Sequence, residues 1–249
     1  MSLGLWTFHS ICTSAVGDVY STMKQECGVV ELGRWQNERE LVLNTALQLV
    51  EKGLVIGTSG NVSQRLRQDK GPDLIVITPT SRYYDSMTAD DIPVVSLDGS
   101  RVEGCLDPSS EVLMHIAIYK ARSDVDAVIH THSTYASTVS VSGLEIPAIL
   151  EEEVMLLGGP IRVARYARSG TIELANNVVT GLEGRSAVVM ANHGAVGVAK
   201  TMREALNACE LLEKAAKVYL LALATGKINL LPTEAITSGQ AYFSRNHNP

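Results

Sequence analysis

The sequence lacks any long apolar run and any block of basic residues. Its apolar runs fall far short of the ~20 residues that a membrane-spanning helix needs, so we expect no membrane helix and no membrane partner. With 21 Lys and Arg against 27 Asp and Glu, the net charge is −6. Without a basic cluster, nucleic acid is not an expected partner. The first 20 residues are mildly apolar but lack a basic segment, so we do not expect a signal peptide.

Cysteines are few and scattered. None of the four, Cys12, Cys27, Cys105 and Cys209, belongs to a CxxC pair. In a chain of this size such spacing predicts free thiols and a reducing, cytoplasmic location. Internal repeats, low-complexity tracts and linkers are missing as well. The composition, 45% apolar and 19% charged over 249 residues, indicates a globular protein of one large domain or at most two.

The pattern of apolar residues predicts helices and strands in alternation. Leu43, Leu47 and Val50 recur at helical spacing, and Gly53 follows as a helix end. The sequence from Thr201 to Glu204 has the pattern of a capping box, which predicts a long helix to Thr225. Further helices are expected over residues 108–121, 135–141 and 171–182, and strands over residues 74–78, 94–97, 127–129, 186–190 and 194–198.

Three histidines follow predicted strands. His130 and His132 come directly after Ala127–Ile129, and strand alternation turns both side chains to the same face. His193 follows a second apolar run, residues 187–190. Three neutral imidazoles with one open position are the ligand set of a catalytic zinc site. The alternative is that these are ordinary hydrogen-bonded histidines at strand ends, and the HxH pair alone does not decide between the two.

Three turns rich in glycine and hydroxyl groups are candidate anion seats. They are residues 57–63 (GTSGNVS), residues 79–82 (PTSR) and the helix opening at residues 108–110 (PSS). Backbone amides in such turns and at helix N-termini favour negative charge. Ordinary turns and plain helix capping are the alternatives, although capping does not explain Glu111. His115, one turn beyond Glu111, either packs in the core or touches the metal.

Taken in order, five motifs resemble the class II sugar-phosphate aldolases related to L-fuculose-1-phosphate aldolase. The motifs are GTSGNVS (57–63), ITPTS (77–81), PSSE (108–111), HTHS (130–133) and NHG (192–194). That superfamily also holds L-ribulose-5-phosphate 4-epimerase, methylthioribulose-1-phosphate dehydratase and the adducin head domain. The resemblance covers residues 37–223, most of the chain, and five motifs in one order make it specific.

The resemblance implies a fold and an assembly. It implies an α/β, three-layer α/β/α sandwich around a central, mostly antiparallel sheet, in a single domain. Residues 35–226 would form the catalytic domain, and residues 227–249 a C-terminal tail near the active site. Residues 1–34 would be an N-terminal extension, loosely held or added by cloning. The relatives are commonly cyclic homotetramers with active sites between subunits.

The resemblance also implies roles for individual residues. His130, His132 and His193 would hold Zn²⁺, with Mn²⁺ or Co²⁺ as alternatives. Glu111 matches the catalytic glutamate, a metal ligand at rest and a proton shuttle in turnover. The substrate phosphate would be bound by Gly60, Asn61, Thr80, Ser81, Ser109 and Ser110. The family often has glycine at the position of Ser81.

One departure concerns the residue that handles the proton of the scissile hydroxyl. The fuculose aldolase pattern has a tyrosine just after IPAI, where this chain has Leu150 and Glu151. A glutamate could replace that tyrosine, as in the dehydratase relatives, and which of the three consecutive glutamates 151–153 faces the site stays open. Tyr242 is the expected counterpart of a second tyrosine in the family's mobile tail.

The expected activity is retro-aldol cleavage of a ketose 1-phosphate, such as L-fuculose 1-phosphate or a related 5-deoxypentulose 1-phosphate, into dihydroxyacetone phosphate and an aldehyde. Methylthioribulose-1-phosphate dehydratase is the first alternative. Ribulose-5-phosphate 4-epimerase is disfavoured because such epimerases carry Asp where Glu111 stands. A non-catalytic, adducin-like interaction module would show degraded metal ligands, whereas all three histidines are present.

Overall fold

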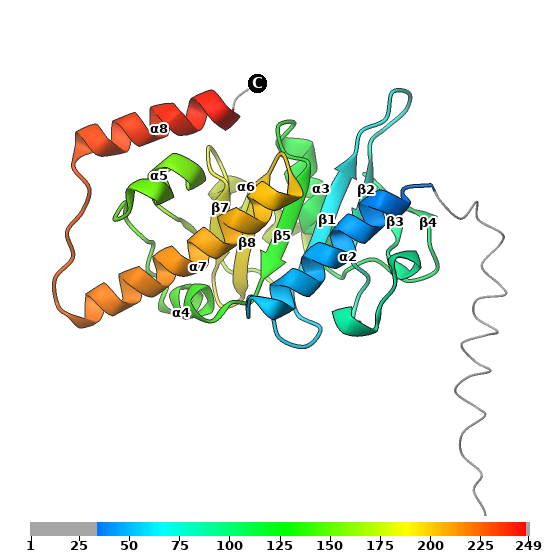
Figure 1. Cartoon of the computed structure of the whole chain (residues 1–249), viewed down its shortest axis with the longest axis horizontal. Helices are drawn as coiled ribbons and strands as arrows, with labels where there is room; N and C mark the ends of the chain where they lie inside the picture. Colours follow the sequence, from blue (N-terminus) through cyan, green and yellow to red (C-terminus); the bar gives the residue numbers. More distant parts are fainter. Residues whose placement is uncertain (1–33, 248–249) are drawn as a thin grey trace, which may run out of the picture. The chain divides into compact units, whose positions relative to one another are not determined.

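The structure is a computed structural model that describes residues 34–247. The predicted N-terminal extension therefore lies almost wholly outside the described residues. An eight-stranded sheet forms the centre of the described part, with strand order β4-β3-β2-β1-β5-β8-β7-β6 (Figure 1). All neighbouring strands are antiparallel except β6 and β7. The strands are β1 Asn61–Leu66, β2 Leu74–Ile77, β3 Val94–Ser96, β4 Arg101–Glu103, β5 Ala127–Thr131, β6 Val163–Ala164, β7 Ala187–Met190 and β8 Gly194–Ala199.

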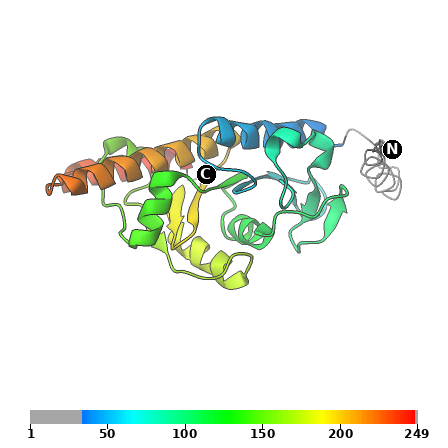
Figure 2. The ribbon, with the colours of Figure 1, turned by 90° about the horizontal axis from the view of Figure 1, so that it is seen from below.

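Helices cover both faces of the sheet. They are α2 Gln36–Glu51, α3 Val112–Ala121, α4 Thr134–Ser142, α5 Glu151–Leu157, α6 Ile172–Gly181, α7 Met202–Ala224 and α8 Thr233–His247, with short 3₁₀ turns at Tyr84–Ser86 and Ala89–Asp91. Figure 2 shows α2 and α7 on one side of the sheet and α3 and α6 on the other. The expected three-layer sandwich around a mostly antiparallel sheet is confirmed.

Strand alternation explains which core cluster each strand residue joins. In β5, Ile129 faces α2 and α7, whereas Val128 faces α3 and α6. In β2, Val76 and Ile75 divide between the same two clusters. Because both faces are covered, the central strands are buried throughout, and their sequences are continuous apolar runs rather than alternating ones.

Helix ends follow the predicted signals in several places. Thr201 and Glu204 form the capping box that begins α7, and the Thr171 hydroxyl accepts from the Leu174 amide at the start of α6. One boundary differs from the prediction. Helix α3 begins at Val112, with Glu111 as its N-cap, because residues 108–110 form a turn that pairs with the neighbouring loop.

The predicted C-terminal tail, residues 227–249, contains helix α8. Phe243 anchors this helix and is only 6% exposed. Its ring lies so close to Gly158, at the end of α5, that a side-chain Cβ there would come within 3.0 Å of it. One buried aromatic residue and the packing on α5 therefore hold a helix whose sequence has only a weak apolar stripe.

Two further expectations concern cysteines and the membrane. Cys209 is a buried free thiol, as expected. Cys105 is disulfide-bonded, so the expectation of four free thiols is wrong for that residue. None of the helices in residues 34–247 is both long and apolar enough to cross a membrane.

Candidate active site

The three predicted histidines meet at one end of the central strands. His130 is in β5, His132 directly follows it, and His193 lies in the turn between β7 and β8. Because β5 pairs with β8 in a register that sets Thr131 opposite Ala195, this turn lies beside the end of β5. The ring centroids are 4.7, 4.8 and 5.0 Å apart, and the potential ligand atoms all lie within 4.8 Å of one another.

Gly194 makes this convergence possible. A Cβ on Gly194 would lie 2.3 Å from the Thr131 carbonyl oxygen, 3.0 Å from His130 Cε1 and 3.2 Å from His132 Cδ2. Any side chain here would push β8 away from β5 and separate the imidazoles. The glycine of the NHG motif is thus explained by close approach, since its φ is not in the left-handed region.

Hydrogen bonding orients the imidazoles for a cation. His130 Nδ1 lies 2.9 Å from the Ala195 carbonyl oxygen, to which it donates, so its Nε2 is the nitrogen left for a ligand. His130 Nε2 and His132 Nε2 are 2.8 Å apart. Burial, followed by the charge on His130, lowers the pKa of His132 to about 4, and burial also lowers that of His193. Imidazole nitrogens that converge in this way fit a divalent metal ion such as zinc.

Glu111 adjoins the histidines. Its Oε2 is 3.1 Å from His130 Nε2, and its Oε1 is 3.5 Å from His193 Nε2. Burial opposes charge on the carboxyl, but the imidazoles of His130 and His193 and a hydrogen bond from Asn61 outweigh it and hold the pKa of Glu111 well below its usual range. The same attraction raises the pKa of His130 despite burial. The site therefore holds an ionised carboxylate beside the nitrogen cluster.

Asn61 lies opposite His130 in the pairing of β1 with β5, and its side chain connects Glu111 to His115. The Asn61 side chain donates to Glu111 Oε2 over 3.0 Å, and its carbonyl oxygen is hydrogen-bonded to His115 Nε2. Both amide atoms of Asn61 are thus engaged inside the protein. His115 is fully buried and does not belong to the three-histidine group, so the packing alternative for His115 is the one that the structure favours.

The hydroxyl-bearing turns lie side by side near Glu111. Pro79 and Pro108 form a bridge between the two turns, and the Ser109 amide donates to the Thr78 carbonyl over 3.0 Å. Thr80 is half-buried, while Ser81 and Ser110 are exposed, and Ser109 is 5% exposed. Ser81 has φ 55°, in the left-handed region, which explains why glycine suits this position in the family.

Gly60 is fixed by its surroundings. It has φ 74°, and a Cβ there would lie 2.7 Å from the His130 carbonyl oxygen and 2.5 Å from Val55 Cγ1. The loop 57–60 is thereby held against the end of β5. Five of the six predicted phosphate residues, Gly60, Thr80, Ser81, Ser109 and Ser110, thus belong to loops that adjoin Glu111 or the end of β5. The side chain of the sixth, Asn61, bonds to Glu111 and His115 instead. The part of these residues in phosphate binding stays a prediction.

Sequence reasoning missed Ser169. Its hydroxyl donates to Glu111 Oε1 over 3.0 Å, and it comes from the loop between β6 and α6. Gly170 lets this loop approach, since it has φ 76° and a Cβ there would lie 2.9 Å from the Ser110 carbonyl oxygen. The Arg-Ser-Gly sequence is a weak turn signal and could not have indicated which distant residue the serine meets.

The three consecutive glutamates separate in the structure. Glu153 is fully buried and accepts from the Ile149 amide, so it stabilises the start of α5. Glu152 forms an ion pair with Lys214. Glu151 is exposed and lines a cavity of about 220 Å³ together with Tyr242 and other residues of α5 and α8. Of the three, Glu151 is the one whose carboxylate has no partner among the described residues.

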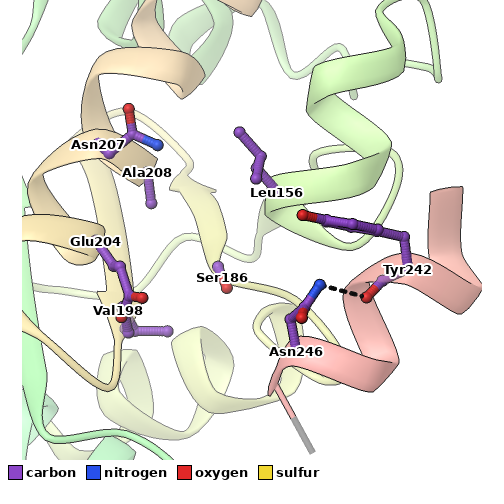
Figure 3. Close-up of a pocket in the computed structure, with 9 residues that line it drawn as sticks. Leu156, Ser186, Val198, Glu204, Asn207, Ala208, Tyr242 and Asn246 are labelled. Atoms are coloured by element: carbon purple, nitrogen blue, oxygen red, sulfur yellow. Dashed lines mark hydrogen bonds between the residues drawn. The ribbon is translucent and has the colours of Figure 1, made fainter.

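Tyr242 does not lie near the histidines of its own chain. It lines a cavity of about 310 Å³ between α5, α7 and α8, together with Ser186 and Val198 (Figure 3). Ser186 precedes β7 and Val198 is near the end of β8, whereas His193 joins the opposite ends of these strands. A strand of this length spans roughly 13 Å. Within one chain, Glu151 and Tyr242 are therefore together but apart from the metal cluster.

Comparisons with known proteins agree with this arrangement. Residues 40–220 match the family described as Class II Aldolase and Adducin N-terminal domain. The chain is 35% identical to 5-deoxy-D-ribulose 1-phosphate aldolase of Bacillus thuringiensis serovar kurstaki over 200 residues, 80% of this chain and 92% of that protein. It is 35% identical to L-fuculose phosphate aldolase of Escherichia coli over 78% of this chain and 88% of that protein. A solved structure of L-fuculose 1-phosphate aldolase has a TM-score of 0.79 at 36% identity, covering 84% of this chain and 96% of that one.

Proposed function

The chain belongs to the class II aldolase and adducin family and is an aldolase of the sugar-phosphate type, and from this premise we propose that it is a zinc enzyme that cleaves a ketose 1-phosphate into dihydroxyacetone phosphate and an aldehyde. The observation that carries the proposal is the meeting of three imidazoles and the Glu111 carboxylate beside two hydroxyl-bearing turns.

In this proposal the glycine- and hydroxyl-rich turns bind the phosphate group of the substrate. Amides and hydroxyls from Gly60, Thr80, Ser81, Ser109 and Ser110 would bind the dianion without a positive side chain. Uncharged phosphate-binding groups suit this site, because they add no positive charge that would compete with the metal ion for the negative charge formed during the reaction. They also suit a chain whose net charge is −6.

For the reaction itself, we assign to Glu111 the transfer of a proton to C3 of the substrate. His130, His132 and His193 would hold zinc, which supplies Lewis-acid stabilisation of the charge that builds up on the ketone oxygen. When the C3–C4 bond breaks, its electron pair stays with C3 and the C4 hydroxyl loses its proton to a base. Glu111 then delivers a proton to C3. For this Glu111 must gain a proton during the cycle, although the resting site keeps it ionised.

We assign the proton of the C4 hydroxyl to Glu151 and Tyr242 of a neighbouring subunit. Both side chains line one cavity, and Tyr242 lies with Ser186 and Val198 at the ends of β7 and β8 that are opposite to His193 of the same chain. They can act only if a second chain sets them against another chain's metal site. This agrees with the homotetramer, with active sites between subunits, that the resemblance implies.

Shared active sites are testable by mixing inactive chains. A Glu111→Gln subunit and a Tyr242→Phe subunit, produced together, should regain part of the activity, because some sites in the mixed assembly contain both intact groups. Each variant produced alone serves as the control. If the mixture is no more active than the better of the two variants alone, the assignment to a neighbouring subunit is wrong.

For the substrate we propose a ketose 1-phosphate with a deoxy, methyl-bearing aldehyde end. The two relatives named above are named for 5-deoxyribulose 1-phosphate and for fuculose phosphate, and both sugars end in a methyl group. The test is a panel of the zinc-loaded protein with 5-deoxyribulose, fuculose, rhamnulose and methylthioribulose 1-phosphates, assayed for dihydroxyacetone phosphate. Mass spectrometry separates cleavage into two pieces from loss of one water, which would identify a dehydratase instead.

A further inference from the structure

A hydrogen-bonded series of buried polar side chains connects the core to Glu111. Beginning at Glu111, it passes through Asn61, His115 and Ser63 to Tyr119. His115 and Ser63 are 0% exposed and Tyr119 is 2% exposed. Polar groups are expensive to bury unless their hydrogen bonds are made, and core positions are ordinarily apolar. Here each of these side chains is hydrogen-bonded to the next one, so the whole series can be buried without unpaired polar groups between its members.

The direction of each hydrogen bond follows from how the Asn61 amide lies. Its NH₂ group donates to Glu111 Oε2 over 3.0 Å, and its carbonyl oxygen, which can only accept, faces His115 Nε2. His115 Nε2 must then carry the proton and donate. Burial lowers the pKa of His115 to about 3, so the ring is neutral and Nδ1 has no proton. Ser63 accordingly donates to Nδ1 over 2.6 Å.

The last link completes this order. Tyr119 donates to the Ser63 hydroxyl over 2.7 Å or to the Ser63 carbonyl over 3.0 Å. In either case the donors from Ser63 through His115 to Asn61 all point toward Glu111. If His115 had the other tautomer, its bare Nε2 would face the Asn61 carbonyl oxygen, and the amide would rotate to present that oxygen to the carboxylate. A single proton position on His115 thus determines whether Glu111 meets a donor or an acceptor.

We propose that His115 is a positioning residue for Glu111, which acts through Asn61 by fixing the amide so that it donates to Oε2. Ser169 holds the other oxygen, Oε1, from the opposite side. The carboxylate is thereby held by two donors while it waits beside the imidazoles. This inference rests on the proposed role of Glu111 in catalysis, but the hydrogen-bond order itself does not.

Kinetics of two His115 variants give the first test. His115→Leu removes the donor to Asn61, and its expected effect is a fall of roughly ten- to hundred-fold in kcat with little change in KM, because the phosphate turns are untouched. His115→Gln offers an N–H near the position of Nε2 and should recover most of that loss. Thr45→Val is the matched control, since Thr45 is also a buried polar residue, 2% exposed, whose hydroxyl bonds only within α2.

Nitrogen-15 NMR of the metal-free protein gives a second test that needs no activity. The spectrum should show His115 with a protonated Nε2 and a bare Nδ1, and the slowly exchanging NH₂ group of Asn61 should become exposed to exchange in His115→Leu. Ser63→Ala removes the donor to Nδ1 and should shift His115 toward the other tautomer, so it also keeps the inference testable if His115→Leu fails to fold.

The outcomes are distinct. An active wild-type enzyme with unchanged kcat in folded His115→Leu would overturn the positioning role while leaving the proposed function intact. A protonated Nδ1 in the wild type would overturn the hydrogen-bond order. An inactive wild type across the whole sugar-phosphate panel would instead count against the proposed function, while the NMR result would still decide the order of the hydrogen bonds.

Discussion

Replacing Gly194 by alanine should damage the metal site more than the fold. The added Cβ would lie 2.3 Å from the Thr131 carbonyl oxygen, where ordinary contacts begin at 3.4 Å, so β8 and the end of β5 must separate by about 1 Å. Two of the other close atoms belong to His130 and His132. Overpacking of this kind costs about 1–3 kcal/mol of unfolding free energy. Displaced ligands should also weaken zinc binding roughly 10- to 100-fold.

Gly197→Ala in the same strand is the matched control. A Cβ there would lie 2.5 Å from Cys209 Sγ and 3.0 Å from the Ala205 carbonyl oxygen, so it overpacks the helix interface without touching an imidazole. Zinc affinity is measured by competition with a chromophoric chelator, and unfolding free energy by urea titration. We expect both variants to lose stability, and Gly194→Ala alone to lose zinc affinity. Equal zinc affinities in the two variants would refute the reasoning.

Burial raises the pKa of Glu153 to about 7, so the folded state binds the proton of Glu153 more tightly than the unfolded state does. The stability that comes from this proton should be complete at low pH and should disappear as the pH rises toward 7. Its upper limit is on the order of 3 kcal/mol. In Glu153→Gln this slope in urea unfolding from pH 5 to 8 should vanish, and an unchanged slope would exclude Glu153 as its source. Because Ser81 has φ 55°, Ser81→Gly should be more stable than Ser81→Ala by about 1 kcal/mol, and equal melting temperatures would contradict this. Removing the metal with a chelator should abolish activity reversibly and lower the melting temperature, because bound metal stabilises the folded state by mass action. Circular dichroism should still show the folded secondary structure. Persistent activity in metal-free protein would count against the metal site.

The sequence was sufficient for much of the metal site. An HxH pair after an apolar strand, with a third histidine after another, predicts convergence because strand alternation and sheet pairing leave few other arrangements. The three-layer α/β/α arrangement was likewise predictable, through the resemblance of five sequence motifs to the class II aldolases. The requirement for glycine at Gly194 was not, since it depends on the distance between two strands that are far apart in sequence.

Other parts of the site depend on tertiary contacts that have no local signal. Ser169 lies in a loop, and nothing in its neighbours indicates that it reaches Glu111. Glu151 and Glu153 could be told apart only once the start of α5 was known, since each residue of shift turns a helical side chain by about 100°. Tyr242 was expected in a loose tail, whereas a single buried aromatic, Phe243, holds it on a helix away from the histidines.

The central claim is that Glu111 moves a proton beside a metal held by three imidazoles. The most direct measurement compares zinc content and dihydroxyacetone phosphate release in wild type and Glu111→Gln, with the preferred ketose 1-phosphate of the panel. The account predicts that Glu111→Gln keeps about one zinc per chain, as three histidines suffice to hold it, and loses most turnover. Near-normal turnover in zinc-loaded Glu111→Gln would contradict it.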